Sequence, residues 1–312
     1  MSAVSPRIAF QGEPGANSDM ACRAVFGAAL EPLPCPSFDD AFAAVKNGEA
    51  SHAMIPIDNT LAGRVADIHR LMPDSGLQIV GEYFMPIHFQ LMALPGTRRE
   101  EIVSVHSHVH ALGQCRQYLR RNGWKAVIAG DTAGAAREVS EGGDRSQAAL
   151  APELAAGLYG LEILDRNVED SENNVTRFVI LRDPEKLPPS DSEEQRLSLW
   201  AARDPQPTER GRAYISHDVV TTFIFRVRNI PGALYKGLGG FATNGINMTK
   251  LESYQIGGTF SATLFYADIE GHPHDPPVAR ALEELRFFSA EFRNLGVYRA
   301  APDRHALLAP AE

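Results

Sequence analysis

The chain has 312 residues, of which 44% are hydrophobic and 22% charged, values typical of a globular protein with about two domains. Its formal net charge of −9 argues against a nucleic-acid partner, and an anionic substrate would need a local basic pocket. No apolar run reaches membrane-spanning length, the N-terminus lacks a signal peptide's apolar core, and three scattered cysteines favour a reduced, cytoplasmic protein.

Short apolar strands alternate with helical stretches from residue 7 to residue 183. Ser18 is a candidate cap for a helix that ends at Gly27, and Ser37 caps the next helix, which ends at Gly48. The remaining pattern predicts strands at 8–11, 53–57, 78–84, 89–94, 103–107, 125–129, 148–151 and 175–181, and helices at 111–121, 132–140 and 153–159. This alternation predicts an α/β fold with largely parallel sheets, whose ligands bind beyond the carboxyl ends of the strands.

The composition changes at residues 184–218, where five prolines lie among Ser, Asp, Glu and Arg, as in a linker. The following pattern predicts strands at 222–227, 246–254, 259–267 and 292–298, helices at 231–243 and 277–287, and a hairpin turn at Gly257-Gly258. This order is βαββαβ, the ferredoxin-like unit.

Four polar clusters, at residues 11–18, 56–64, 105–115 and 173–178, fall where strands end. In the last cluster, Arg177 interrupts a buried strand, so it must pair with an acid of the chain or bind an anion. His106, His108 and His110 alternate, but no carboxylate or cysteine completes a metal site. No P-loop, nucleophile elbow or dinucleotide fingerprint occurs, so we expect chemistry that uses no cofactor and no metal.

These segments resemble the prephenate dehydratases of phenylalanine biosynthesis, including the plant arogenate dehydratases. The similarity covers almost the whole chain and is carried by residues 56–60 (Pro-Ile-Asp-Asn-Thr), residues 107–115 (Ser-His through Gln-Cys) and residues 174–178 (Asn-Val-Thr-Arg-Phe). The chain departs from the family pattern at Asn17, Asp58, Val109-His110 and Tyr254-Gln255.

The resemblance implies a two-lobed, periplasmic-binding-protein-like catalytic domain with parallel or mixed sheets at 7–183, a linker at 184–218 and a regulatory ACT domain at 219–300. It implies a carbon–oxygen lyase that converts prephenate to phenylpyruvate, water and carbon dioxide. Thr176 would be catalytic, as a hydrogen-bond donor to the leaving hydroxyl. The residues implied to bind substrate are Arg177, Asn59, Ser107, Gln114, His108 and Ser18. Arg177 would clamp a substrate carboxylate in place of a protein acid.

The ACT resemblance implies feedback inhibition by L-phenylalanine, bound where two ACT domains meet in a homodimer or homotetramer. The implied effector residues are Asn229, Gly232, Ala233, Leu234, Glu252 and Ser253. We expect no membrane partner and, because the chain shows no chorismate mutase segment, a monofunctional enzyme. Two alternatives stay open: an arogenate dehydratase, and a non-catalytic small-molecule-binding sensor protein.

Overall fold

The computed structural model describes residues 7–186, 218–255, 263–304 and 306. They form two compact units, the first from Met1–Val65 and Tyr83–Phe178 and the second from Ala66–Glu82 and Val179–Glu312. The second unit thus includes residues 66–82, which lie inside the predicted catalytic domain. Most of the predicted linker and the Gly257-Gly258 turn lie outside the described residues.

The first sheet of the first unit contains the N-terminal strands. Its elements are β1 (Arg7–Gln11), α1 (Asn17–Phe26), β2 (Glu31–Cys35), α2 (Phe38–Asn47), β3 (His52–Asn59), β4 (Gly63–Arg64), β5 (Gln78–Pro86) and β11 (Val175–Arg182). The strand order is β5-β11-β3-β1-β2, and β1 runs parallel to both neighbours. The carboxyl ends of β1 and β3 therefore lie at the same edge, which is where a ligand is expected.

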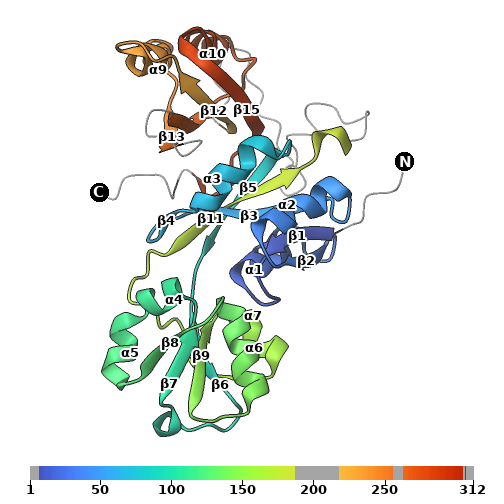
Figure 1. The fold of residues 1–312 in the computed structure, drawn as a ribbon, viewed down its shortest axis with the longest axis vertical. Coiled ribbons are helices and arrows are strands. Elements are labelled where there is room, and N and C mark those ends of the chain that lie inside the picture. The colour runs from blue at the N-terminus through green and yellow to red at the C-terminus, as the bar shows by residue number, and fades with distance from the viewer. Residues whose placement is uncertain (1–6, 187–217, 256–262, 305, 307–312) are drawn as a thin grey trace. The chain divides into compact units, whose positions relative to one another are not determined.

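The second sheet of this unit is mixed. Its elements are β6 (Gln90–Ala93), η2 (Arg99–Glu101), β7 (Ser104–Ser107), α4 (Val109–Gln114), α5 (Arg116–Asn122), β8 (Lys125–Ile128), α6 (Thr132–Gly142), β9 (Gln147–Ala151), α7 (Glu153–Tyr159) and β10 (Glu162–Asp165). β7 pairs in parallel with β8 and β9, whereas β6 runs antiparallel to β9 and β10. Helices α6 and α7 lie on one side of the sheet and α4 and α5 on the other (Figure 1).

The second unit contains the predicted βαββαβ order. Its elements are α3 (Ala66–Leu71), η1 (Met72–Asp74), η3 (Pro184–Lys186), β12 (Val219–Val227), α9 (Ala233–Thr243), β13 (Met248–Gln255), β14 (Thr263–Glu270), α10 (Pro276–Phe288) and β15 (Ser289–Arg299). The strand order β13-β14-β12-β15 confirms the ferredoxin-like prediction, and the start of β5 adds a further strand beside β15. Phe223, Phe225 and Ala267 of the sheet pack in one core with buried residues of α9 and α10.

Local sequence signals explain some boundaries and fail at others. The Ser37 side chain accepts a hydrogen bond from Asp40 N and caps α2, as predicted. Ser18 instead lies inside α1, whose N-cap is Ala16, so the prediction that Ser18 caps this helix is wrong. The predicted helix 111–121 is divided at Cys115 into α4 and α5. Among the described residues, no helix has both the length and the apolar composition needed to cross a membrane.

Gly296 is expected to tolerate no side chain, because it lies where β15 pairs with β5. A Cβ atom at this position would come within 2.2 Å of the Ile79 carbonyl oxygen. We therefore expect Gly296→Ala to lower the free energy of unfolding by about 1–3 kcal/mol, or more if the strands separate. Urea denaturation measures this change. Gly239→Ala in α9 is the matched control, since a Cβ atom there meets nothing within 4 Å, and an equal loss in both variants would contradict the prediction.

Candidate active site

A cavity of about 290 Å³ lies in the first unit, a volume that suits a small-molecule ligand. Its wall combines the carboxyl ends of β1 and β3 with β11 and with the first turns of α1, α4 and α6. The lining residues are Gln11, Gly12, Ala16, Asn17, Ser18, Pro56, Asn59, Ala62, Val65, Ile87, Phe89, His108, His110, Ala111, Gln114, Gly130, Asp131, Thr132, Thr176 and Phe178. Strand ends and helix N-termini both present backbone groups that bind polar ligands.

The side-chain amide of Asn59 is the centre of a hydrogen-bond network at the cavity wall. Its Oδ1 accepts hydrogen bonds from the backbone N–H groups of Leu61 (3.0 Å) and Ala62 (2.8 Å). Its Nδ2 donates to Asn174 Oδ1 (2.8 Å) and to Thr176 Oγ1 (2.9 Å). Because the oxygen is held by the turn that follows β3, only the NH₂ group can face Thr176. The orientation of the amide is therefore fixed by the backbone.

Thr176 lies on β11, is 9% exposed and lines the cavity together with Phe178, two residues further along the strand. Its hydroxyl accepts a hydrogen bond from Asn59, and among the described residues it has no other hydrogen-bond partner. A hydroxyl carries a single proton, and Asn59 offers Thr176 only a donor. The O–H of Thr176 is thus left to donate to a ligand in the cavity.

Gln114 and Asn174 extend the same network from α4 to β11. Asn174 Nδ2 donates to Gln114 Oε1 over 2.8 Å, while Asn174 Oδ1 accepts from Asn59. Asn174 is 1% exposed, and its side chain links Asn59 of β3 to Gln114 of α4 through two partly buried hydrogen bonds. Asn174 is not one of the predicted site residues, although it directly precedes the Val-Thr-Arg-Phe run.

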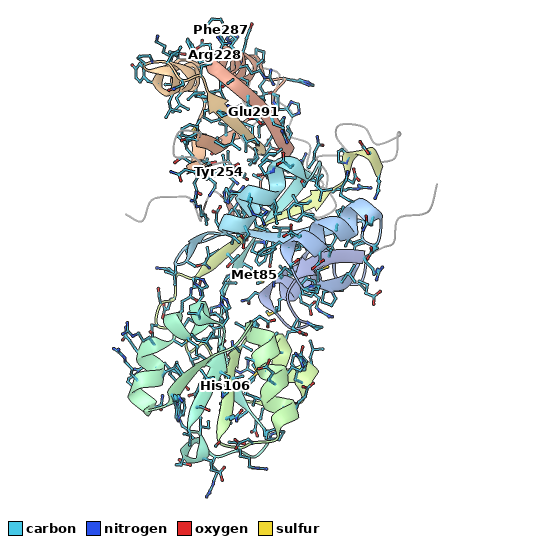
Figure 2. All side chains as sticks on the ribbon, in the orientation of Figure 1. Met85, His106, Arg228, Tyr254, Phe287 and Glu291 are labelled. Atoms are coloured by element: carbon cyan, nitrogen blue, oxygen red, sulfur yellow. The ribbon has the colours of Figure 1, made fainter. Side chains whose placement is uncertain are left out.

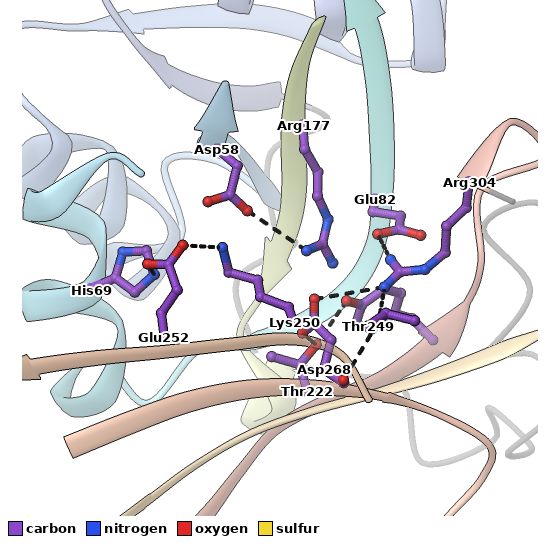
Figure 3. Close-up of polar contacts among 11 residues, drawn as sticks. Asp58, His69, Glu82, Arg177, Thr222, Thr249, Lys250, Glu252, Asp268 and Arg304 are labelled. Atoms are coloured by element: carbon purple, nitrogen blue, oxygen red, sulfur yellow. Dashed lines mark hydrogen bonds and ion pairs between the residues drawn. The ribbon is translucent and has the colours of Figure 1, made fainter. Parts of the chain in front are cut away.

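Arg177 is not among the residues that line the cavity. Successive side chains of a strand point to opposite faces, so Thr176 and Phe178 face the cavity and Arg177 faces away from it. Its guanidinium Nη1 lies 3.8 Å from Asp58 Oδ2, and the group stacks over the Phe84 ring at 5.9 Å (Figure 3). The expectation that Arg177 has no acid of the chain as its partner is therefore wrong, and the alternative of an ordinary buried ion pair describes this position.

The two serines predicted to bind substrate lie in different places. Ser107 is fully buried, and its hydroxyl donates to Leu150 O over 2.6 Å, so it joins β7 to β9 and does not line the cavity. Because a hydroxyl has a single proton, Ser107 cannot also donate a hydrogen bond to a ligand. Ser18, in the first turn of α1, does line the cavity.

The three histidines at 106, 108 and 110 do not act as one group. His106 lies on β7, shares a hydrogen bond with Ser104 and is labelled in Figure 2. His108 and His110 both line the cavity, with their rings stacked at 5.1 Å and an interplanar angle of 26°. His108 is one of the predicted site residues, whereas His110 and Asp131 are not. Asp131 caps α6 by accepting from Gly134 N over 2.6 Å.

The residues predicted to bind an effector lie in two places of the second unit. Asn229, Gly232, Ala233 and Leu234 lie in the turn before α9 and in its first residues, and Gly232 has a φ of +72°, which favours glycine. Glu252 pairs with Tyr266 across the sheet, on the face opposite the core beneath α9 and α10. Its carboxylate contacts Lys250 Nζ (2.8 Å) and lies 3.7 Å from His69 Nε2. Ser253, the next residue along β13, points to the opposite face.

Asn59→Asp tests whether the amide sets the direction of the Thr176 hydroxyl. A carboxylate can only accept, so in this variant Thr176 would donate to the new carboxylate and would no longer donate into the cavity. For a reaction catalysed in this cavity, we expect kcat to fall by about 10²-fold while the fold stays intact. This is close to the effect of removing the Thr176 hydroxyl. Steady-state kinetics with circular dichroism as the check on folding measure this, and wild-type turnover in the variant would contradict the proposed direction.

Comparison with known proteins identifies the family of the chain. The family model described as prephenate dehydratase matches residues 8–186. A bifunctional N-acyl-homoserine lactone acylase/prephenate dehydratase of Komagataeibacter europaeus is 48% identical, over 95% of this chain and 97% of the relative. Arogenate dehydratase/prephenate dehydratase 1 of Arabidopsis thaliana is 35% identical, over 94% and 71% of the two chains. The crystal structure of prephenate dehydratase in complex with L-Phe from Arthrobacter aurescens matches with a TM-score of 0.78 and 30% identity, covering 98% of this chain and 92% of that one. The chain therefore belongs to the prephenate dehydratase family.

Proposed function

We propose that the protein is a prephenate dehydratase, which removes water and carbon dioxide from prephenate to form phenylpyruvate in phenylalanine biosynthesis. The observation that carries this proposal is the pair of Asn59 and Thr176 at the cavity wall. Because the amide of Asn59 donates to Thr176, the threonine hydroxyl can donate only toward the cavity, where the leaving group of the substrate would lie.

The reaction needs little beyond a well-placed donor, since forming the aromatic ring supplies its driving force. The C–O bond at C4 breaks with its electron pair leaving on oxygen, and the bond to the ring carboxylate supplies the pair that completes the ring. One proton, taken up from the solvent, joins the departing hydroxyl to form water. Thr176 stabilises the charge that develops on that oxygen. The backbone N–H groups at the start of α1 suit a substrate carboxylate, because helix N-termini bind anions.

The decisive assay is the formation of phenylpyruvate from prephenate by the purified protein, followed by ultraviolet absorbance. We expect turnover that depends on enzyme concentration and needs no added metal or cofactor. Binding of prephenate without turnover would instead support the alternative of a non-catalytic sensor protein.

Arogenate remains the alternative substrate, since the Arabidopsis relative carries both activities in its name. Arogenate has an amino group where prephenate has a keto oxygen, so the two differ at the side chain and not at the ring. Comparing kcat/KM for both substrates with the same preparation decides between them.

Hydrolysis of N-acyl-homoserine lactones is a second candidate function, which is not among the alternatives predicted from the sequence. It is favoured by the relative at 48% identity, whose name combines acylase and prephenate dehydratase activities. Release of homoserine lactone and a fatty acid, measured by mass spectrometry, tests it. The same measurement on Thr176→Val tells whether the two reactions share the cavity.

Regulation by L-phenylalanine belongs to the proposal, with residues 219–300 as an ACT domain and the Arthrobacter structure in complex with L-Phe as its support. Within one chain Glu252 lies on the sheet face away from α9, so joint contact with Gly232 would use a second copy in a homodimer or homotetramer. Calorimetry with L-phenylalanine and with L-leucine as control tests this, and the affinity should fall in Gly232→Val. A catalytic domain at 7–183, a linker at 184–218 and a cytoplasmic location complete the proposal.

A further inference from the structure

The cavity wall carries no permanently positive side chain, which is unexpected for a site that would bind a dicarboxylate. Among the described residues that line it, none is Lys or Arg, and Asp131 is the one residue with a formal charge at neutral pH. The net charge of −9 adds an unfavourable field around the whole molecule. The two imidazoles of His108 and His110 are the only side chains in this wall, as the structure describes it, that can become positive.

The geometry of the two imidazoles favours protonation of one ring over protonation of both. His108 and His110 stack at 5.1 Å, so two positive charges would repel each other. His108 Nδ1 accepts from His110 N over 3.4 Å, which leaves Nε2 of that ring for a ligand. His110 is exposed and His108 is partly buried, so both sit at the boundary between the cavity and water.

We propose that His108 and His110 together take up one proton when a dicarboxylate enters the cavity, and that this imidazolium supplies the positive charge that binds the substrate. The inference rests on the proposed function, because prephenate carries two carboxylates. It assigns His110 a binding role and explains how a wall without Lys or Arg can hold a dianion.

The groups around the pair fix the sign of the pH dependence. Burial lowers the pKa of His108 below its ordinary value, the neighbouring His110 lowers it further, and Asp131 opposes the shift. The other acids near this end of the unit are engaged: Glu169 contacts His88, and Asp170 accepts from backbone N–H groups at the start of α5. Burial in the empty cavity therefore disfavours the His108 imidazolium, and a bound dianion favours proton uptake by the pair.

The expected result is a KM for prephenate that rises with pH, by about tenfold per pH unit between the pKa of the pair in the free enzyme and its pKa in the complex. Steady-state kinetics from about pH 6 to about pH 9, a range that spans the titration of a histidine, measure it. His110→Gln keeps a polar side chain of similar length without a charge, and we expect it to raise KM near pH 6.5 about tenfold and to flatten the slope. His106→Gln, on the neighbouring strand and outside the cavity wall, is the matched control and should keep the slope.

Calorimetry measures directly how many protons the protein takes up when prephenate binds. Prephenate is titrated into Thr176→Val, which should bind without rapid turnover, in buffers of different ionisation enthalpy at about pH 7.5, above the ordinary pKa of a histidine side chain. An uptake close to one proton per site is expected, and no uptake overturns the inference, as does a slope of KM that His110→Gln retains. If the wild-type protein forms no phenylpyruvate at any pH, the proposed function fails instead, so the two failures are distinguishable.

Discussion

Thr176→Val is expected to lower kcat for prephenate by about 10²–10³-fold while KM changes much less. Valine has nearly the shape of threonine, so the wall between Asn59 and Phe178 keeps its form and only the hydroxyl is lost. That hydroxyl accepts from Asn59 Nδ2 over 2.9 Å and has its proton left for the cavity. A donor placed before the reaction stabilises the charge on the departing oxygen without reorganising, which is why its loss affects the transition state more than the bound substrate.

The controls for Thr176 separate the hydroxyl from its surroundings. Thr176→Ser keeps the O–H and should retain turnover within about tenfold, since serine can still accept from Asn59 and donate to the cavity. Circular dichroism and the urea midpoint should match the wild type in both variants. A near-normal kcat in Thr176→Val would show that Thr176 takes no part in the chemical step. If kcat/KM falls only because KM rises, Thr176 is a binding residue.

Thr176 and Arg177 were both predicted to face the substrate, but only Thr176 lines the cavity, and the reason is the two-residue period of a strand. Thr176 and Arg177 are adjacent in the sequence, so a motif treats them as one unit. In the structure they point to opposite faces, and Arg177 meets Asp58. The apolar run around them predicts the strand but not which face borders the cavity, since both faces of β11 are buried.

Other errors arise where tertiary contacts override a local signal. Strand β2 is absent from the predicted elements and contains Pro32 and Pro34, which are tolerated because β2 lies at the edge of its sheet. The helix around Cys115 divides into two, and the second starts where Asp170 accepts from the backbone N–H groups of Gln117 and Tyr118. That carboxylate is far away in the sequence, so no window of a few residues contains the reason for the break.

The most buried charges among the described residues of the second unit lie outside every motif of the sequence. Arg304, beyond the predicted ACT boundary at residue 300, is 1% exposed, and Glu82 and Asp268 are fully buried. Arg304 Nη1 lies 2.5 Å from Glu82 Oε2, and Nη2 donates to Thr249 Oγ1 over 2.7 Å and lies 3.7 Å from Asp268 Oδ2 (Figure 3). A separation of 222 residues between Glu82 and Arg304 hides this contact from any local pattern.

Arg304→Met is therefore expected to lower the free energy of unfolding by about 3–5 kcal/mol, because it leaves two buried carboxylates without their shared guanidinium. Glu82 Oε1 also accepts a hydrogen bond from Ala301 N over 3.1 Å. Loss of the Arg304 guanidinium should therefore also destabilise the segment that follows β15. Urea denaturation measures the energy, and hydrogen exchange of the β12 and β14 amides locates it in the second unit.

A double variant distinguishes lost charge pairing from lost packing. In Glu82→Gln/Arg304→Met the neutral amide can still accept from Ala301, so at least ~1 kcal/mol of stability should return relative to Arg304→Met alone. Arg293→Met is the matched control, since its side chain is 45% exposed and pairs with an Asp74 side chain that is 89% exposed, and its effect should stay within about 1 kcal/mol. If the two arginine variants lose equal stability, or the double variant regains none, the buried carboxylates are not what Arg304 stabilises.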